Sequence, residues 1–136
     1  KKGGDLGMAL VDSNIFIGVS KPGVLTGHMI HTMAPKPIIF AMANPDPEIL
    51  PEQALKAGAA VVATGRSDYP NQINNSLAFP GIFRGALDNG VRRITDAMKI
   101  KAAQNIAALV KRPTAAKVVP GPFEKGIAQA VARAIK

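Results

Sequence analysis

The sequence Pro37-Ile-Ile-Phe-Ala-Met-Ala43 is apolar from end to end. A strand with one face in solvent alternates apolar and polar residues, whereas a strand covered on both faces does not. Two similar runs lie on either side of it in the sequence, at residues 14–20 and 59–64. We therefore expect three buried parallel strands, each covered on both faces.

Residues that commonly begin and end helices separate the three apolar runs. Thr26–Met33 is predicted to be a short helix with Thr26 as a possible N-cap. Pro51–Ala57 is predicted to be a second helix, with Pro51 at its first position and Gly58 at its end. The order strand, helix, strand, helix, strand predicts a parallel sheet joined by right-handed crossovers.

The second half of the chain has helical rather than strand-like spacing of its apolar residues. Helices are expected over residues 74–87, 94–110 and 123–135. Thr95 or Asp96 is expected to cap the second of these. The inward residues expected on the third are Ile127, Ala130, Val131 and Ala134. The fold class is thus α/β: half of a doubly wound parallel sheet of about three strands with trailing C-terminal helices.

Composition limits the kinds of protein this chain can be. Its 136 residues, 47% of them hydrophobic, suit one globular domain, and no apolar run approaches a membrane span. The chain has no cysteine, which excludes disulfides and thiolate ligands and fits a cytoplasmic location. A net charge of +8 favours an anionic partner, either a nucleic acid or a phosphorylated cofactor with a carboxylate substrate.

Ligands of open parallel sheets bind beyond the carboxyl ends of the strands, so the loops there are the candidate sites. The first loop, residues 18–23, is either a cofactor contact or a tight strand-to-helix turn. In the second, Asn44 either binds a ligand through its amide or closes an Asn-Pro turn. The third, residues 64–75, is long and polar, and its Asn74 and Asn75 either cap a helix or hold a ligand.

Other polar residues give weaker signals. His28 and His31 share one predicted helix, but no carboxylate there completes a metal site. The carboxylates Asp46, Glu48 and Asp68 could do acid-base work, although helix-start and surface roles explain them as well. A basic run from Arg92 to Lys117 lacks the interleaved aromatic residues that stack on bases, which favours a solvated face. No G-x-G-x-x-G or G-K-[ST] motif occurs, so the sheet lacks a pyrophosphate loop of its own.

At the three loops the sequence resembles the malic enzymes of the short bacterial and archaeal type. The matching segments are Phe16-Ile-Gly-Val-Ser20 with Pro22-Gly-Val-Leu25, Ile39-Phe-Ala-Met-Ala-Asn-Pro-Asp-Pro-Glu48, and Ala63-Thr-Gly-Arg-Ser-Asp-Tyr-Pro-Asn-Gln-Ile-Asn-Asn75, which continues into Leu77-Ala-Phe-Pro-Gly-Ile-Phe-Arg-Gly-Ala-Leu-Asp88. The resemblance covers about residues 11–110. It implies the C-terminal part of a Rossmann-like cofactor domain and the oxidative decarboxylation of malate to pyruvate with NAD or NADP.

The resemblance also implies roles for individual residues. The cofactor-binding residues would be Gly18, Val19, Ser20, Asn44 and Asn74, and those that bind malate would be Asn44, Asn74 and Asn75. The catalytic tyrosine and lysine of the family and the ligands of its Mg or Mn ion belong to preceding regions, so no catalytic or metal-binding residue is expected here. Tyr69 is not expected to replace the catalytic tyrosine.

The chain is therefore expected to be a fragment whose partners are malate or pyruvate, the missing N-terminal part and further copies in an oligomer of at least two chains. Residues 1–112 would form the C-terminal portion of the NAD(P)-binding domain, and residues 113–136 a linker and a helix packed on it. The strand at 14–19 would normally pair with the missing part, which leaves an apolar edge and predicts self-association or poor solubility. The alternative function is a basic α/β module that binds nucleic acid or another polyanion. A structural or dimerising role for the last two helices is compatible with either.

Overall fold

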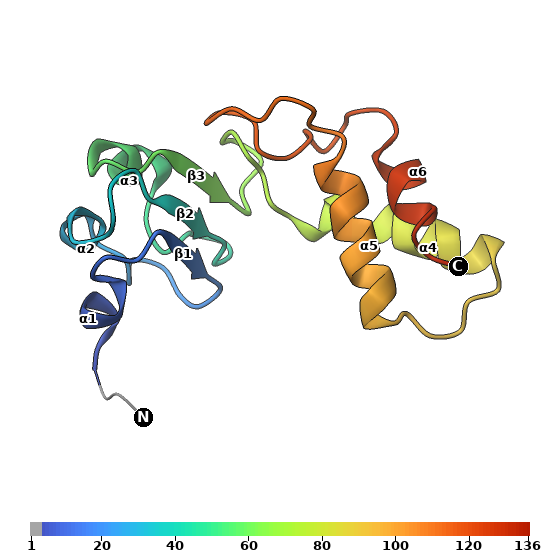
Figure 1. The fold of residues 1–136 in the computed structure, drawn as a ribbon, viewed down its shortest axis with the longest axis horizontal. Coiled ribbons are helices and arrows are strands. Elements are labelled where there is room, and N and C mark those ends of the chain that lie inside the picture. The colour runs from blue at the N-terminus through green and yellow to red at the C-terminus, as the bar shows by residue number, and fades with distance from the viewer. Residues whose placement is uncertain (1–3) are drawn as a thin grey trace. The chain divides into compact units, whose positions relative to one another are not determined.

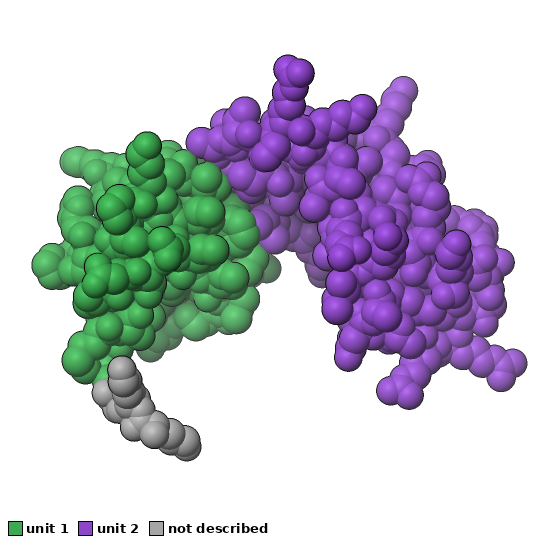
Figure 2. All heavy atoms as spheres, viewed as in Figure 1, with its two compact units in different colours: residues 1–70 green, residues 71–136 purple. Residues whose placement is uncertain are grey.

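A computed structural model describes residues 4–136 of the chain. The chain forms two compact units, of which unit 1 ends at Pro70 and unit 2 runs from Asn71 to Lys136 (Figure 2). Each unit has its own buried cluster of apolar side chains. Over the described range, none of the helices combines the length and the apolar character that crossing a membrane requires.

Unit 1 is built on a parallel sheet with the strands β1 (Ile15–Gly18), β2 (Ile38–Ala41) and β3 (Val61–Thr64) (Figure 1). The strands pair in the order β1-β2-β3, and the residues in register at their starts are Ile15, Ile38 and Val61. The predicted set of three parallel strands in an α/β fold is therefore confirmed.

The helices among the described residues of unit 1 are α1 (Leu6–Leu10), α2 (Gly27–His31) and α3 (Pro51–Lys56). The Thr26 side chain accepts a hydrogen bond from the backbone N–H of Met29 at 3.3 Å, which confirms the predicted cap of α2. Pro51 opens α3 as predicted, and Gly58 follows its end with a φ of 97° that favours glycine. Helix α1 has no counterpart among the predicted elements.

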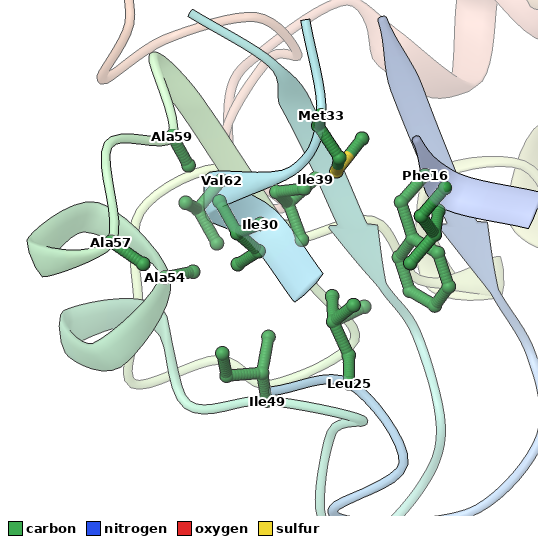
Figure 3. Packing of buried hydrophobic residues seen from close by; sticks show 12 residues of the cluster. Phe16, Leu25, Ile30, Met33, Ile39, Ile49, Ala54, Ala57, Ala59 and Val62 are labelled. Carbon is green, nitrogen blue, oxygen red and sulfur yellow. The ribbon is translucent and has the colours of Figure 1, made fainter. Parts of the chain in front are cut away.

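The core of unit 1 lies on one face of the sheet. Phe16, Ile39 and Val62 are in register and buried, and they pack with Ile30 of α2 and Ala54 of α3 (Figure 3). Full burial of one such aliphatic or aromatic side chain stabilises a fold by about 1.5–3 kcal/mol. The packing of α2 and α3 on the strands thus holds this face of the sheet in place.

The opposite face of β1 is open, and the expectation that all three strands are covered on both faces is wrong at this strand. Ile15 is 52% exposed and Ile17 is 63% exposed. The reason is that, among the described residues, the helices of unit 1 cover only the face of Phe16. Strand β1 also forms one end of the strand order, which confirms the predicted edge position.

Unit 2 is helical and contains the 3-10 turn η1 (Asn75–Leu77) and the helices α4 (Phe79–Asp88), α5 (Asp96–Ala107) and α6 (Ile127–Ala132) (Figure 1). The prediction of one continuous helix over 74–87 is wrong at its start. Pro80 lies in the first turn of α4, and proline has no backbone N–H to donate to the residue four before it, so a continuous helix cannot run through position 80 and α4 begins after η1.

The other two predicted helices of unit 2 are present but shorter than expected. Thr95 caps α5 by accepting a hydrogen bond from the N–H of Met98 at 3.3 Å. The last helix was expected from residue 123, yet α6 begins only after Gly126, whose φ of 94° is left-handed. Phe123, assigned to that helix by the pattern, is 98% exposed. The inward residues predicted for this helix are confirmed, since all are buried: Ile127, Ala130, Val131 and Ala134.

Helix α6 packs against both α4 and α5. Two glycines of α4 allow the close approach, because a Cβ atom at Gly85 would lie 2.7 Å from the carbonyl oxygen of Ala132, and Gly81 similarly faces Val131. On the other side, Ala102 of α5 joins Val131 and Ile135 in a buried cluster. The last residues of the chain are therefore an integral part of the core of unit 2.

Candidate functional site

The candidate site in unit 1 lies at the carboxyl edge of the sheet. Strands β1, β2 and β3 end there at Gly18, Ala41 and Thr64, and because the strands are parallel their following loops emerge at the same edge. Backbone and side-chain groups from these loops can therefore converge on one ligand.

A buried carboxylate connects the first two loops. Glu48 has no exposed surface, and its Oε1 accepts a hydrogen bond from the backbone N–H of Ser20 at 2.8 Å. The Oε2 of the same residue accepts from the N–H of Ala43 at 3.0 Å. The surface role that the sequence allowed for Glu48 is therefore wrong. The carboxylate can be buried because backbone N–H groups of the loop after β1 and of the loop after β2 donate to it.

Gly18 is required where β1 passes this carboxylate. A Cβ atom at position 18 would lie 2.5 Å from the Cδ of Glu48 and 2.7 Å from the Cε1 of Phe16. Both distances are shorter than non-bonded carbon atoms tolerate. The glycine therefore lets the strand end lie directly on the Glu48 side chain.

The first loop offers its ligand an apolar and a hydroxyl group rather than a phosphate cradle. The N–H of Ser20 is already used by Glu48, whose carboxylate lies behind the loop and disfavours an anion there. Val19 is 76% exposed at the strand end, and Ser20 is exposed as well. Such a surface fits an uncharged ring or sugar better than a pyrophosphate.

Asn44 is an exposed polar residue of the second loop. It follows Ala43, whose backbone is held by Glu48, and precedes a cis peptide bond to Pro45. Its side-chain amide can both donate and accept hydrogen bonds. Asn44 was expected directly at the end of the strand, but β2 ends at Ala41, three residues earlier, and the contact of Asn44 with a ligand stays a prediction.

Arg66 connects the second and third loops, a link that the sequence did not indicate. Its Nε and Nη2 donate to the carboxylate of Asp68 at 2.9 and 2.7 Å, and its Nη1 donates to Asp46 at 3.2 Å. The guanidinium also lies 5.5 Å from the ring centre of Tyr69. Paired arginine and carboxylate groups of this planar kind hold both partners in a defined orientation.

These contacts change the acidity of the groups involved. The hydrogen bonds from Arg66 lower the pKa of Asp68, and the same pairing raises the pKa of Arg66. Burial raises the pKa of Tyr69, and the negative charge of Glu52 adds to the rise. Tyr69 is therefore a weaker acid than an ordinary tyrosine, and the expectation that it is not a catalytic residue stays a prediction.

In unit 2 the two adjacent asparagines lie at the start of the first helical turn. Asn74 Oδ1 accepts a hydrogen bond from the N–H of Ser76 at 3.0 Å, so Asn74 caps η1. Asn75 is exposed. The capping role that the sequence allowed for this pair is therefore observed at Asn74, and ligand binding by either residue stays a prediction.

Asn71 is a structural asparagine that the sequence did not single out. It is 7% exposed, and its Nδ2 donates to the carbonyl oxygen of Ala115 at 2.8 Å. Its Oδ1 accepts from the N–H of Val118 at 2.8 Å. The Asn71 side chain therefore supplies hydrogen-bond partners for backbone groups at both ends of the segment 115–118.

The histidines and the basic run of the described residues lie on the surface. His28 and His31 are exposed on α2. Within residues 4–136, histidine and acidic side chains nowhere gather in the groups of three or more that could hold a metal ion. The residues of the basic run are all exposed, as a solvated face requires: Arg92, Arg93, Lys99, Lys101, Lys111, Arg112 and Lys117.

A cleft of about 900 Å³ lies between α2 and α3 and is lined by residues that include His31, Gln53 and Lys56. Its lining also includes Glu48 and other residues of the first two loops, but neither Val19 nor Asn44. The cleft therefore reaches two of the loops of the predicted site without including these two residues.

Comparison with known proteins relates this arrangement to one enzyme family. Residues 8–135 match the family model described as malic enzyme, NAD binding domain. The bifunctional malic/malolactic enzyme of Bacillus subtilis is 57% identical over 99% of this chain, and the NADP-dependent malic enzyme of Rhizobium meliloti is 58% identical over 78% of it. The crystal structure of the NAD-dependent malic enzyme of Thermotoga maritima is 47% identical over 98% of this chain, with a TM-score of 0.92.

The matched region is a minor part of each of these proteins. It makes up 33% of the Bacillus protein, 14% of the Rhizobium protein and 35% of the Thermotoga chain. The matches do not favour the alternative of a basic module that binds nucleic acid or another polyanion.

Proposed function

Because this chain belongs to the malic enzyme family, we propose that it is part of an enzyme that oxidises and decarboxylates malate to pyruvate and carbon dioxide with NAD or NADP. The match of residues 8–135 to the NAD-binding domain of that family is the observation that carries the proposal. The absence of cysteine fits the further proposal that the enzyme works in the reducing cytoplasm.

Unit 1 would contribute to the nicotinamide end of the cofactor, which accepts the hydride when it is bound. Gly18, Val19 and Ser20 would lie along it, and the exposed side chain of Val19 can pack on a flat ring. The buried carboxylate behind Ser20 supports the assignment to an uncharged part of the cofactor.

The asparagines would bind malate and the nicotinamide group. Asn44 of unit 1 and Asn74 and Asn75 of unit 2 each carry a neutral amide, which donates to a carboxylate or hydroxyl without adding a charge to the site. Hydrogen bonds of this kind orient a substrate for hydride transfer. Support for Asn44 comes from its exposure after the end of β2.

Other parts of the chemistry would come from outside this chain. The family is expected to use a Mg or Mn ion, but the side chains of residues 4–136 do not fit such a site, since they form no acidic or histidine cluster. No step is assigned to a metal here, and no catalytic acid or base is proposed among these residues. We further propose that the enzyme is a homo-oligomer of at least two chains.

The proposal is tested with the full-length protein that contains this segment. Malate-dependent reduction of NAD and of NADP is measured by absorbance, together with pyruvate formation. Asn44→Ala and Asn74→Ala are each expected to lower kcat/KM about tenfold or more through loss of a hydrogen bond to a charged or polarised group. Asn14→Ala, at the exposed amino end of β1, is the matched control and is expected to leave the kinetics unchanged. Wild-type protein without malate-dependent activity would refute the function, and unchanged kinetics in both variants would refute the site.

A further inference from the structure

Glu48 is a buried acidic residue to which the proposed chemistry gives no task. A buried carboxylate is costly unless its oxygens are satisfied, and here both oxygens accept hydrogen bonds from backbone N–H groups. We propose that Glu48 is a positioning residue, which sets the loop after β1 and the loop after β2 at a fixed separation and thereby places Asn44 for hydride transfer. This inference rests on the proposed function.

The contacts of Glu48 reach three separate segments of unit 1. Its carboxylate accepts from Ser20 after β1 and from Ala43 after β2. Its own carbonyl oxygen accepts from the N–H of Leu25 at 3.2 Å. The residue thus fixes both ends of the first loop and the residue directly before Asn44.

A carboxylate performs this task better than a neutral side chain. Hydrogen bonds to a charged acceptor are shorter and roughly twice as strong as those between neutral groups. Glutamine at position 48 has one acceptor oxygen, and its NH₂ group would face one of the two N–H donors. One of the loops must then move away. The backbone of β1 at Gly18 lies directly against the Glu48 carboxylate, which leaves the side chain little room to shift toward β1.

A merely structural role predicts a different result from a positioning role. If Glu48 only stabilises unit 1, its replacement lowers the amount or the melting temperature of folded enzyme, and the molecules that remain folded react normally. If Glu48 positions Asn44, folded molecules transfer hydride more slowly, and this step limits turnover more strongly.

The experiment uses the full-length enzyme with Glu48→Gln, Glu48→Asp and the control Glu52→Gln, which makes the same chemical change at an exposed residue of α3. The readouts are kcat per folded enzyme, KM for malate, and the isotope effect on kcat with malate deuterated at C2. We expect Glu48→Gln to lower kcat by about 10- to 100-fold with a smaller change in KM, as a misplaced reacting group does. We also expect the isotope effect on kcat to be larger in Glu48→Gln than in the wild type. Glu48→Asp keeps the charge but is shorter, so an intermediate loss is expected.

Each other outcome refutes the proposal. A normal kcat and isotope effect in folded Glu48→Gln, with or without a lower melting temperature, would show that Glu48 is structural only. Failure of both Glu48 variants to fold would show the same. A loss equal to that of Glu52→Gln would show a general effect of charge. Absence of malate-dependent reduction by the wild type would instead refute the proposed function, and this inference with it.

Discussion

Gly18 lies against the carboxylate of Glu48, so that a Cβ atom at position 18 would be 2.5 Å from the Glu48 Cδ and from its Oε1. The carboxylate cannot move without losing the N–H groups of Ser20 and Ala43. The end of β1 and the loop after β2 are therefore packed against each other through one side chain.

Gly18→Ala is expected to destabilise unit 1 by about 1–3 kcal/mol, because an added methyl group in a filled space forces its neighbours apart. Urea unfolding of the chain, followed by circular dichroism, measures the change. Gly7→Ala is the control, since a Cβ there meets only ordinary contacts with Asp5 and Met29. Equal stability of Gly18→Ala and the wild type would show that the contact is looser than the structure indicates.

Asn71→Gly is expected to destabilise unit 2 by about 1 kcal/mol, because two part-buried hydrogen bonds to the backbone of Ala115 and Val118 are lost. Glycine is chosen because the φ of Asn71 is 57°, a conformation that glycine also adopts without strain. In the wild type the Val118 N–H donates a hydrogen bond to Asn71 Oδ1, so this N–H should exchange with solvent faster in the variant. Unchanged exchange at Val118 would contradict this assignment, and Asn75→Gly at an exposed position serves as the control.

Asp68→Asn is expected to lower the melting temperature at pH 7 but not at low pH. Arg66 lowers the pKa of Asp68 in the folded state, so this stabilisation is complete above the unfolded pKa of about 3.9 and is lost as the pH falls through the folded pKa. Thermal melts at several pH values should therefore show the gap between variant and wild type closing below about pH 4. The gap should also shrink in high salt, because the pair is exposed. A gap that is constant down to the lowest pH would exclude the ion pair as its cause.

The 136-residue chain alone is expected to self-associate or to be poorly soluble, because Ile15, Ile17 and Val19 form an exposed apolar row on an edge strand. Ile17→Lys should reduce association, as measured by sedimentation velocity. Ile100→Lys is the matched control, since Ile100 has a similar exposure on α5 of unit 2. A monodisperse wild-type monomer would contradict the prediction.

The elements of unit 1 could be predicted from the sequence because their signals are local. Apolar runs mark the strands, and Thr26 and Pro51 mark the starts of helices by chemistry that acts within one turn. The start of α6 was misplaced because the apolar spacing continues through Gly126, whose left-handed backbone interrupts the helix.

The site was predicted only in part, for a related reason. The place of Asn44 follows from the strand before it, which is a local feature. The role of Glu48 depends on Ser20, which is 28 residues away, and no spacing rule connects them. Acidic residues are rarely buried, and the roles that the sequence left open for Glu48 did not include a buried contact between two loops. The link between Arg66 and Asp46 was missed for the same reason, because these two residues are 20 positions apart in the chain.

The contact of Gly18 with Glu48 also restricts how this segment can vary among related proteins. A larger residue at position 18 leaves no room for the Glu48 carboxylate, and it would also meet the ring of Phe16. A relative that keeps glutamate at position 48 should therefore keep glycine at position 18. A larger residue at position 18 should occur only where both residue 48 and residue 16 are smaller.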